Sequence, residues 1–184
     1  MNKALQMMFW GYLFVFFRIH FGFDLLADPI GYYLLYAGSA RLVEQYPQAQ
    51  KAKIAAGLGI VISIPSIFIN LSESHLGGWE VYGFALLVLK LIVAYFLFAV
   101  LKSIVRDFAD RALISRTNRV FNFYISIHLL ALFLSSFSMN VSGDLWITLP
   151  FILGLGVVIM DIAFLLLLGA IRRNEPAHRY DLSV

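Results

Sequence analysis

The sequence predicts an all-α protein, a polytopic transmembrane bundle of about six helices with both termini in the cytoplasm. Hydrophobic residues make up 61% of the 184-residue chain and charged residues only 14%, and the mean hydropathy is +0.82. Soluble domains are about 45–50% apolar and about 25% charged. Because a soluble chain of this length exposes a large share of its residues to water, the composition excludes an ordinary cytosolic enzyme, a disordered chain and a nucleic-acid-binding domain.

Four apolar segments have the length of a membrane span: residues 54–71, 80–101, 120–141 and 145–171. An α-helix rises about 1.5 Å per residue, so about 20 apolar residues cross the hydrocarbon core of a bilayer. We predict two further helices, 4–23 and 29–45, which form a hairpin. Asp28 is a good N-cap for the second of them, and Pro29 suits its first position. The alternative is four spans with this hairpin re-entrant or interfacial.

The positions of the basic residues predict the orientation of the chain. The connections at 22–28, 72–79 and 142–144 contain neither Lys nor Arg. The positive-inside rule places the basic segments, and so both termini, in the cytoplasm of a plasma-membrane protein. We expect residues 1–173 to form one transmembrane helical domain and residues 174–184 to form a short polar cytoplasmic tail. The basic segments hold twelve of the 14 Lys and Arg residues: Lys3, Arg41, Lys51, Lys53, Lys102, Arg106, Arg111, Arg116, Arg119, Arg172, Arg173 and Arg179.

Residues 10–38 read WGYLFVFFRIHFGFDLLADPIGYYLLYAG. This stretch resembles a pattern found in small, uncharacterised multi-pass membrane proteins of Gram-positive bacteria, in which a Trp-Gly and aromatic stretch leads into Phe-Asp-(Ile/Leu)-Leu-Pro-Asp-x-Ile-Gly-Tyr. The chain departs from the pattern at Ala27, where the pattern has Pro. The resemblance covers about the first 40 residues. It implies a bacterial plasma-membrane protein of about six spans and implies no activity. The matching residues are Trp10, Gly11, Phe23, Asp24, Leu25, Leu26, Asp28, Ile30, Gly31 and Tyr32.

Two ionisable residues lie deep inside predicted spans, and we expect them to pair. Lys90 lies near the middle of the span 80–101, and Asp161 lies at a similar depth in the span 145–171. Ionisable groups inside a membrane are costly, and they usually face the bundle interior and one another. The pair has two interpretations: a purely structural link between two helices, or part of a solute or proton site.

The remaining polar candidates are Arg18, Asp24 and Asp28, with His20 beside them, and His128 inside the span 120–141. The first group predicts a salt bridge and cap that fix the hairpin turn, or else a polar mouth for a small solute or headgroup. A lone intramembrane histidine usually bonds to a neighbouring helix, and a proton relay is the alternative. We predict no catalytic residue and no cofactor, because the sequence has no His-Glu-x-x-His, P-loop or Gly-x-Gly-x-x-Gly motif. We also predict no metal site, because two Asp and one His without a recognised spacing are weak evidence for one.

Two other features predict packing and partners. Apolar residues recur at helical spacing in 102–119 among five basic residues, which predicts an amphipathic cytoplasmic helix. Such a helix lies on anionic lipid headgroups or continues the preceding span, and a docking site for a partner is the alternative. Ala55, Gly59 and Ser63 are spaced by four, which predicts close helix packing. Pro65 predicts a kink within the span 54–71.

The sequence therefore predicts a small, non-enzymatic integral membrane protein and leaves its biochemical activity open. One alternative is a small-solute binding or transport subunit, because the size and six-helix plan are similar to the substrate-binding components of vitamin transporters. The other is a regulatory or scaffolding partner of another membrane protein. The expected partners are the lipid bilayer, anionic headgroups at 102–119 and, in the second alternative, a membrane protein. Nucleic acid is not expected.

Overall fold

The fold is a bundle of six α-helices. The computed structural model describes residues 1–16, 28–67, 77–138 and 144–174, and no strand occurs within these ranges. The predicted all-α class with about six helices is therefore confirmed. In chain order, the elements are α1 (Asn2–Phe16), α2 (Asp28–Ala40), α3 (Ala49–Ser63), the short 3-10 helix η1 (Ile64–Ile67), α4 (Gly77–Asp107), α5 (Arg111–Ser138) and α6 (Asp144–Arg173).

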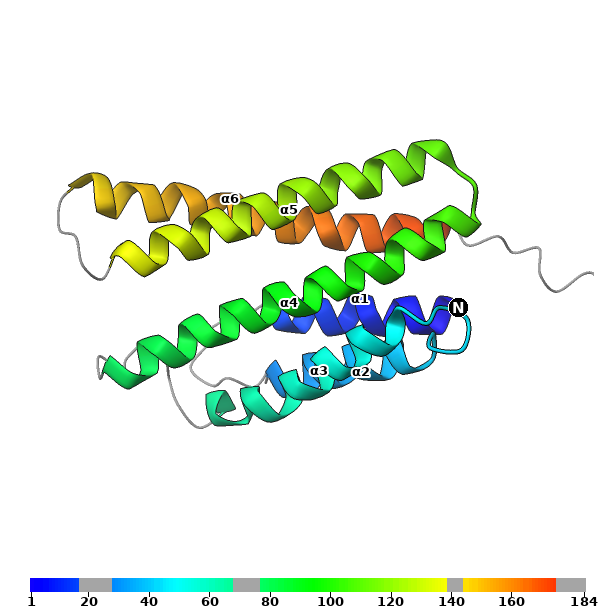
Figure 1. Ribbon diagram of the computed structural model, residues 1–184, viewed down its shortest axis with the longest axis horizontal. Coiled ribbons are helices and arrows are strands. Elements are labelled where there is room, and N and C mark those ends of the chain that lie inside the picture. Colours follow the sequence, from blue (N-terminus) through cyan, green and yellow to red (C-terminus); the bar gives the residue numbers. More distant parts are fainter. Residues whose placement is uncertain (17–27, 68–76, 139–143, 175–184) are drawn as a thin grey trace, which may run out of the picture.

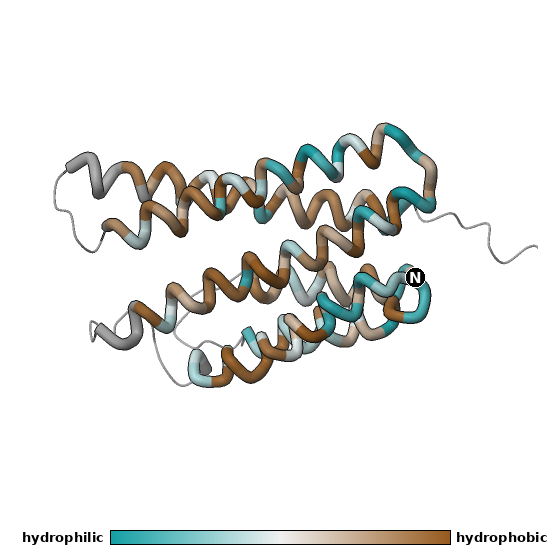
Figure 2. Tube along the Cα trace, viewed as in Figure 1, coloured by the Kyte–Doolittle hydropathy of each residue, from teal (hydrophilic) through white to brown (hydrophobic). Residues whose placement is uncertain are grey.

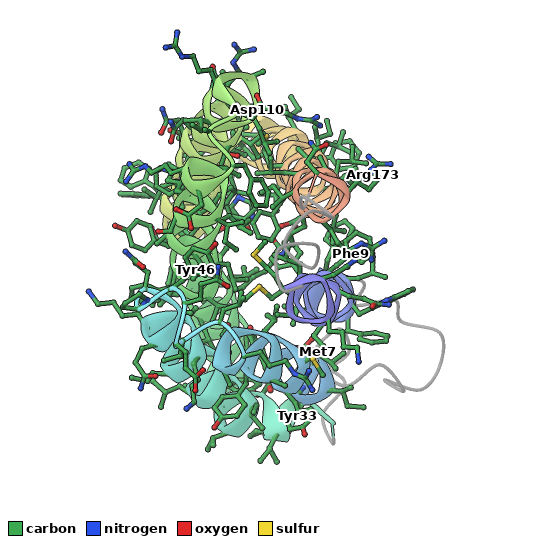
Figure 3. All side chains as sticks on the ribbon, turned by 90° about the vertical axis from the view of Figure 1, so that its right-hand side faces the viewer. Met7, Phe9, Tyr33, Tyr46, Asp110 and Arg173 are labelled. Atoms are coloured by element: carbon green, nitrogen blue, oxygen red, sulfur yellow. The ribbon has the colours of Figure 1, made fainter. Side chains whose placement is uncertain are left out.

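The helices form a closed ring in chain order. Each helix packs against the next along the chain, and α1 packs against α6 to close the ring. Successive helices run in opposite directions, so the N-terminus and the last turn of α6 lie at the same end of the bundle (Figure 1). Figure 3 looks onto this end, where Asp110 and Arg173 lie, and shows side chains filling the space between the helices.

The end of the bundle that holds the N-terminus is also its basic end. The hydrophilic stretches of the helices gather there, whereas the middle of the bundle is predominantly apolar (Figure 2). Segments that are far apart in the sequence thus bring their positive charges to one end. We use the name basic end for the surface that carries Lys3, Arg41, Lys51, Lys53, Lys102, Arg106, Arg111, Arg116, Arg119, Arg172 and Arg173.

Within the described ranges, three helices are long and apolar enough to cross a membrane. They contain the segments Val81–Asp107, Arg111–Phe137 and Phe151–Arg173. The predicted spans 80–101, 120–141 and 145–171 correspond to these helices. Large apolar side chains cover their outer faces, and Val81, Phe151 and Ile159 are each more than 60% exposed. An apolar surface of this extent is unusual on a soluble monomer and suits contact with lipid.

The first three helices are shorter than the long ones. Within the described residues α1, α2 and α3 have 15, 13 and 15 residues. At about 1.5 Å per residue, each is shorter than the roughly 30 Å of hydrocarbon in a bilayer. The prediction for 29–45 is correct at its start but wrong at its end, because α2 stops at Ala40 and turns follow. The prediction for 4–23 extends beyond the described residues.

The chain around Pro65 corrects the predicted span 54–71. The α-helix ends at Ser63, and Pro65 lies in η1 instead of kinking a continuous helix. Proline has no N–H to donate, so the hydrogen-bond pattern of the α-helix stops there and the chain tightens into a 3-10 turn. The Ser63 hydroxyl donates a hydrogen bond to the carbonyl oxygen of Gly59, 2.6 Å away.

The segment 102–119 also differs from its prediction. It forms no separate amphipathic helix, because α4 continues to Asp107 and α5 begins at Arg111 after a short turn. Asp110 marks the start of α5. Its Oδ1 accepts hydrogen bonds from the backbone N–H groups of Ala112 and Leu113, at 2.8 and 3.2 Å. This side chain is an N-cap, which satisfies donors that the first helical turn leaves free. The alternative that the preceding span continues therefore holds only as far as Asp107, and residues 111–119 belong to α5.

Small residues set the spacing of the first three helices. A Cβ atom at Gly11 would lie 2.7 Å from the carbonyl oxygen of Gly31, so α1 and α2 touch through their backbones. A Cβ atom at Gly59 would lie 2.5 Å from the ring of Tyr32, so the backbone of α3 packs directly against a side chain of α2. The predicted close packing of the small-residue face of α3 is confirmed.

Candidate functional site

A buried ion pair between α4 and α6 lies at the centre of the candidate site. The Nζ atom of Lys90 lies 2.6 Å from Oδ2 of Asp161, and the two side chains are 13% and 1% exposed. The predicted pairing of these residues is confirmed. Taking two charges out of water is costly, so such a pair needs further hydrogen bonds to its remaining lone pairs.

Two tyrosine hydroxyls supply those hydrogen bonds. Tyr12 on α1 donates to Oδ1 of Asp161, and the Tyr124 hydroxyl on α5 lies 3.2 Å from the same oxygen. The two hydroxyl oxygens are 2.6 Å apart. Since each phenol has a single hydrogen to donate, Tyr12 gives its hydrogen to Asp161, and the hydrogen of Tyr124 is shared between the Tyr12 oxygen and Oδ1 of Asp161. The carboxylate of Asp161 thus receives donors from α1, α4 and α5.

His128 lies beside this carboxylate without being bonded to it. Its Nδ1 lies 2.9 Å from the carbonyl oxygen of Tyr124 in the same helix. Its Nε2 lies 3.6 Å from Oδ1 of Asp161 and has no hydrogen-bond partner in the described part of the chain. His128 therefore contacts the neighbouring helix α6 at Asp161, as predicted, although the hydrogen bond that it makes lies within α5. We use the name charged cluster for Tyr12, Lys90, Tyr124, His128 and Asp161.

Helix periodicity and aromatic packing hold the charged cluster in place. Tyr124 and His128 are four residues apart on α5, so they share a face, and their rings stack with centroids 3.9 Å apart. The ring of Phe164 lies 4.4 Å from that of Tyr12 and closes the cluster on the α6 side. Lys90 also lies 5.5 Å from the ring centre of Phe16, within the range of a cation–π contact.

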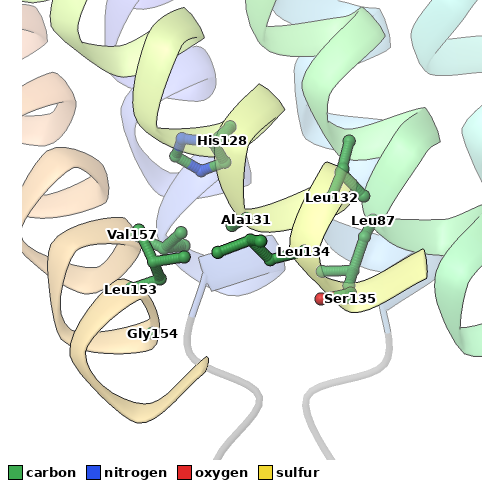
Figure 4. Close-up of a pocket in the computed structure, with 9 residues that line it drawn as sticks. All are labelled: Leu87, His128, Ala131, Leu132, Leu134, Ser135, Leu153, Gly154 and Val157. Atoms are coloured by element: carbon green, nitrogen blue, oxygen red, sulfur yellow. The ribbon is translucent and has the colours of Figure 1, made fainter. Parts of the chain in front are cut away.

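A cavity of about 210 Å³ adjoins the charged cluster. It lies between α5 and α6, with one side chain from α4, and Figure 4 shows its walls. His128 belongs both to the cluster and to the wall of the cavity, and it is the one ionisable residue among those that line it. Engineered apolar cavities of about 150 Å³ hold benzene. The lining residues are Leu87, His128, Ala131, Leu132, Leu134, Ser135, Leu153, Gly154 and Val157.

The other predicted polar group lies largely outside the described residues. Arg18, His20 and Asp24 belong to the undescribed range 17–27. Asp28 is the first residue of α2 and is buried, with 6% of its surface exposed. Of the six candidate residues, the structure therefore brings together Lys90, His128 and Asp161. Within the described ranges, no group of three His, Cys, Asp or Glu side chains could hold a metal ion.

Tyr12 and Tyr124 are the members of the charged cluster that sequence reasoning missed. Both look like ordinary apolar residues of a span, because aromatic residues make up 16% of the chain. One signal was available: Tyr124 precedes His128 by four residues and so shares its helix face. No comparable signal links Tyr12 to Asp161, 149 residues further along the chain.

The fold and this site define an all-helical bundle with three helices long and apolar enough to cross a membrane and with a buried ion pair inside. No known protein family, curated protein or solved structure matches the chain.

Proposed function

We propose that the protein is a multi-pass plasma-membrane protein that binds a small, mostly apolar solute in the cavity between α5 and α6. In this proposal the chain is not an enzyme. The charges of Lys90 and Asp161 neutralise each other, and the hydroxyls of Tyr12 and Tyr124 are engaged with Asp161 and with one another. Such a cluster stabilises a bundle and shapes the wall of a site without offering a free nucleophile.

The proposed topology has both termini in the cytoplasm. It is supported by the collection of eleven described Lys and Arg residues at the basic end, where the N-terminus and the end of α6 also lie. The positive-inside rule assigns such an end to the cytoplasmic side. Anionic lipid headgroups are the proposed partners of this end, including the turn between α4 and α5.

One observation carries the proposal of solute binding: a cavity of about 210 Å³ has apolar walls and a single ionisable wall residue, His128. Small-molecule sites are typically apolar with a few placed polar groups. Because the cavity is lined by the apolar helices α4, α5 and α6, a solute that enters it must be mostly apolar itself.

Toluene binding to the protein in lipid nanodiscs tests the proposal. Wild-type protein should bind toluene saturably, in addition to the linear partition of toluene into lipid. Ala131→Leu should abolish the saturable part, because Ala131 lies in the wall of the cavity (Figure 4). The matched control is Ala85→Leu, the same change at an exposed position of α4 away from the cavity.

The outcome that would contradict solute binding is saturable toluene binding that Ala131→Leu leaves unchanged. Gly154→Leu gives a second test if Ala131→Leu does not fold. A Cβ atom at Gly154 meets nothing within 4 Å, so a larger side chain there is not opposed by a clash.

A further inference from the structure

His128 is held in one tautomer by its own helix. A backbone carbonyl oxygen accepts hydrogen bonds and cannot donate them, so the 2.9 Å contact with the Tyr124 carbonyl requires the hydrogen on Nδ1 of His128. In the neutral ring, Nε2 is then a bare acceptor. The ring is not clamped to the carboxylate of Asp161, because their 3.6 Å separation exceeds the about 2.7–2.9 Å of a charge-assisted N–H···O bond.

Two acceptors therefore face each other at the edge of the charged cluster. Nε2 of His128 has no hydrogen-bond partner in the described part of the chain. Its nearest charged neighbour, Oδ1 of Asp161, already accepts from Tyr12 and is itself an acceptor. Buried polar groups are normally hydrogen-bonded, and a native exception calls for an explanation. The missing component is a hydrogen-bond donor.

The cavity is the side from which a donor can arrive. The other sides of the cluster are occupied: Lys90 bonds to the far oxygen of Asp161, and Tyr12 and Tyr124 pack against Phe164. The wall of the cavity, by contrast, includes the His128 ring. A ligand in the cavity thus brings its apolar body against leucine and valine side chains and one end against the ring.

We propose that the cavity selects a small neutral molecule with an apolar body and one hydrogen-bond donor, such as a hydroxyl group, which bonds to Nε2 of His128. This inference rests on the proposed solute site and specifies what enters it. A cavity of about 210 Å³ admits a single ring with a short substituent and not a diacyl lipid, so the ligand is a free solute. A cation is disfavoured because no acidic side chain is among the described residues that line the cavity, and an acceptor without a donor would leave Nε2 unpaired.

Comparing the binding of phenol with that of anisole separates the contribution of the hydrogen-bond donor from that of the apolar ring. Both carry one ring and one oxygen, but only phenol has a hydrogen to donate. We expect the ratio of phenol to anisole affinity, measured in nanodiscs by titration, to fall about tenfold in His128→Phe, as one lost hydrogen bond predicts. The substituted ring keeps the stacking with Tyr124 and removes the acceptor. The ratio in Ala85→Leu should equal that of wild type.

The outcomes separate the two proposals. If phenol and anisole bind saturably but their ratio is the same in wild type and His128→Phe, the cavity is a solute site and the donor inference is wrong. If neither probe binds saturably to wild type, or if Ala131→Leu and Gly154→Leu leave binding intact, the solute site itself is wrong. If His128→Phe does not fold, His128→Leu replaces it, because leucine also has no hydrogen-bond acceptor. A ratio in this variant that equals that of wild type would also overturn the donor inference.

Discussion

Tyr12 holds the carboxylate of Asp161 from a helix that is remote from it in the sequence. Its hydroxyl is fully buried and donates to a charged acceptor. Tyr12→Phe removes this donor and keeps the ring, so we expect the free energy of unfolding to fall by about 1–3 kcal/mol. Unfolding of the purified protein in detergent measures the change. Tyr33→Phe, at a 57% exposed position, is the control. An equal effect of the two substitutions would contradict the role of Tyr12.

Lys90 places its positive charge directly beside the buried carboxylate of Asp161. Lys90→Met should lower the free energy of unfolding by about 3–5 kcal/mol, because it leaves a buried carboxylate without its cation. Adding Asp161→Asn to Lys90→Met should restore part of this loss. The double-mutant cycle measures a coupling energy of at least about 1 kcal/mol if the two residues pair. The pairing would be disproved if both single variants had the free energy of unfolding of wild type and the effects of the two substitutions added in the double variant.

At the scale of helices, the contact between α1 and α2 depends on the absence of side chains. A Cβ atom at Gly11 would lie 2.7 Å from one backbone atom of α2 and 2.8 Å from another, so Gly11→Ala must push the helices apart. We expect a loss of about 1–3 kcal/mol in the free energy of unfolding. Gly83→Ala is the matched control, because a Cβ there meets nothing within 4 Å, and it should leave stability unchanged or slightly raised. Equal changes in the free energy of unfolding for Gly11→Ala and Gly83→Ala would contradict the backbone contact between α1 and α2.

Sequence reasoning predicted the elements best where the pattern is long and apolar. The helices α4 and α6 carry nearly continuous apolar segments, so their existence and approximate extent follow from hydropathy alone. The same reasoning placed the ends of α2 and α3 too far along the chain. It relies on apolar residues and does not detect the local geometry that ends the helices at Ala40 and before Pro65. It also assigned 102–119 to one amphipathic helix, although the segment is divided between the end of α4 and the start of α5, which Asp110 caps.

The candidate site was predictable in part, for a physical reason. A charge buried inside a span requires a partner, so the similar depth of Lys90 and Asp161 in their spans is enough to predict that they pair. Tyr12 and Tyr124 carry no such signal, because a tyrosine is common both in a core and at a membrane interface. Their role depends on how α1 closes the ring against α6, and no local pattern specifies that contact.

At the scale of the whole molecule, the orientation of the helix bundle in the membrane can be tested directly. The chain has no cysteine, so single-cysteine variants can be labelled without background. In intact cells, a membrane-impermeant maleimide should label Ser142→Cys, in the connection between α5 and α6. It should label Gln48→Cys, between α2 and α3, only after the membrane is opened. The reverse pattern would contradict the cytoplasmic position proposed for the basic end.

The proposed function depends above all on the open cavity beside the charged cluster. Xenon binds apolar cavities in proteins, so an experimental structure determined under xenon pressure measures this most directly. We predict an ordered xenon atom in contact with Ala131 and Val157 in wild-type protein and none in Ala131→Leu. If the space between α5 and α6 of the wild-type protein is filled by side chains and holds no ordered xenon, the cavity does not exist and the proposed solute site is wrong.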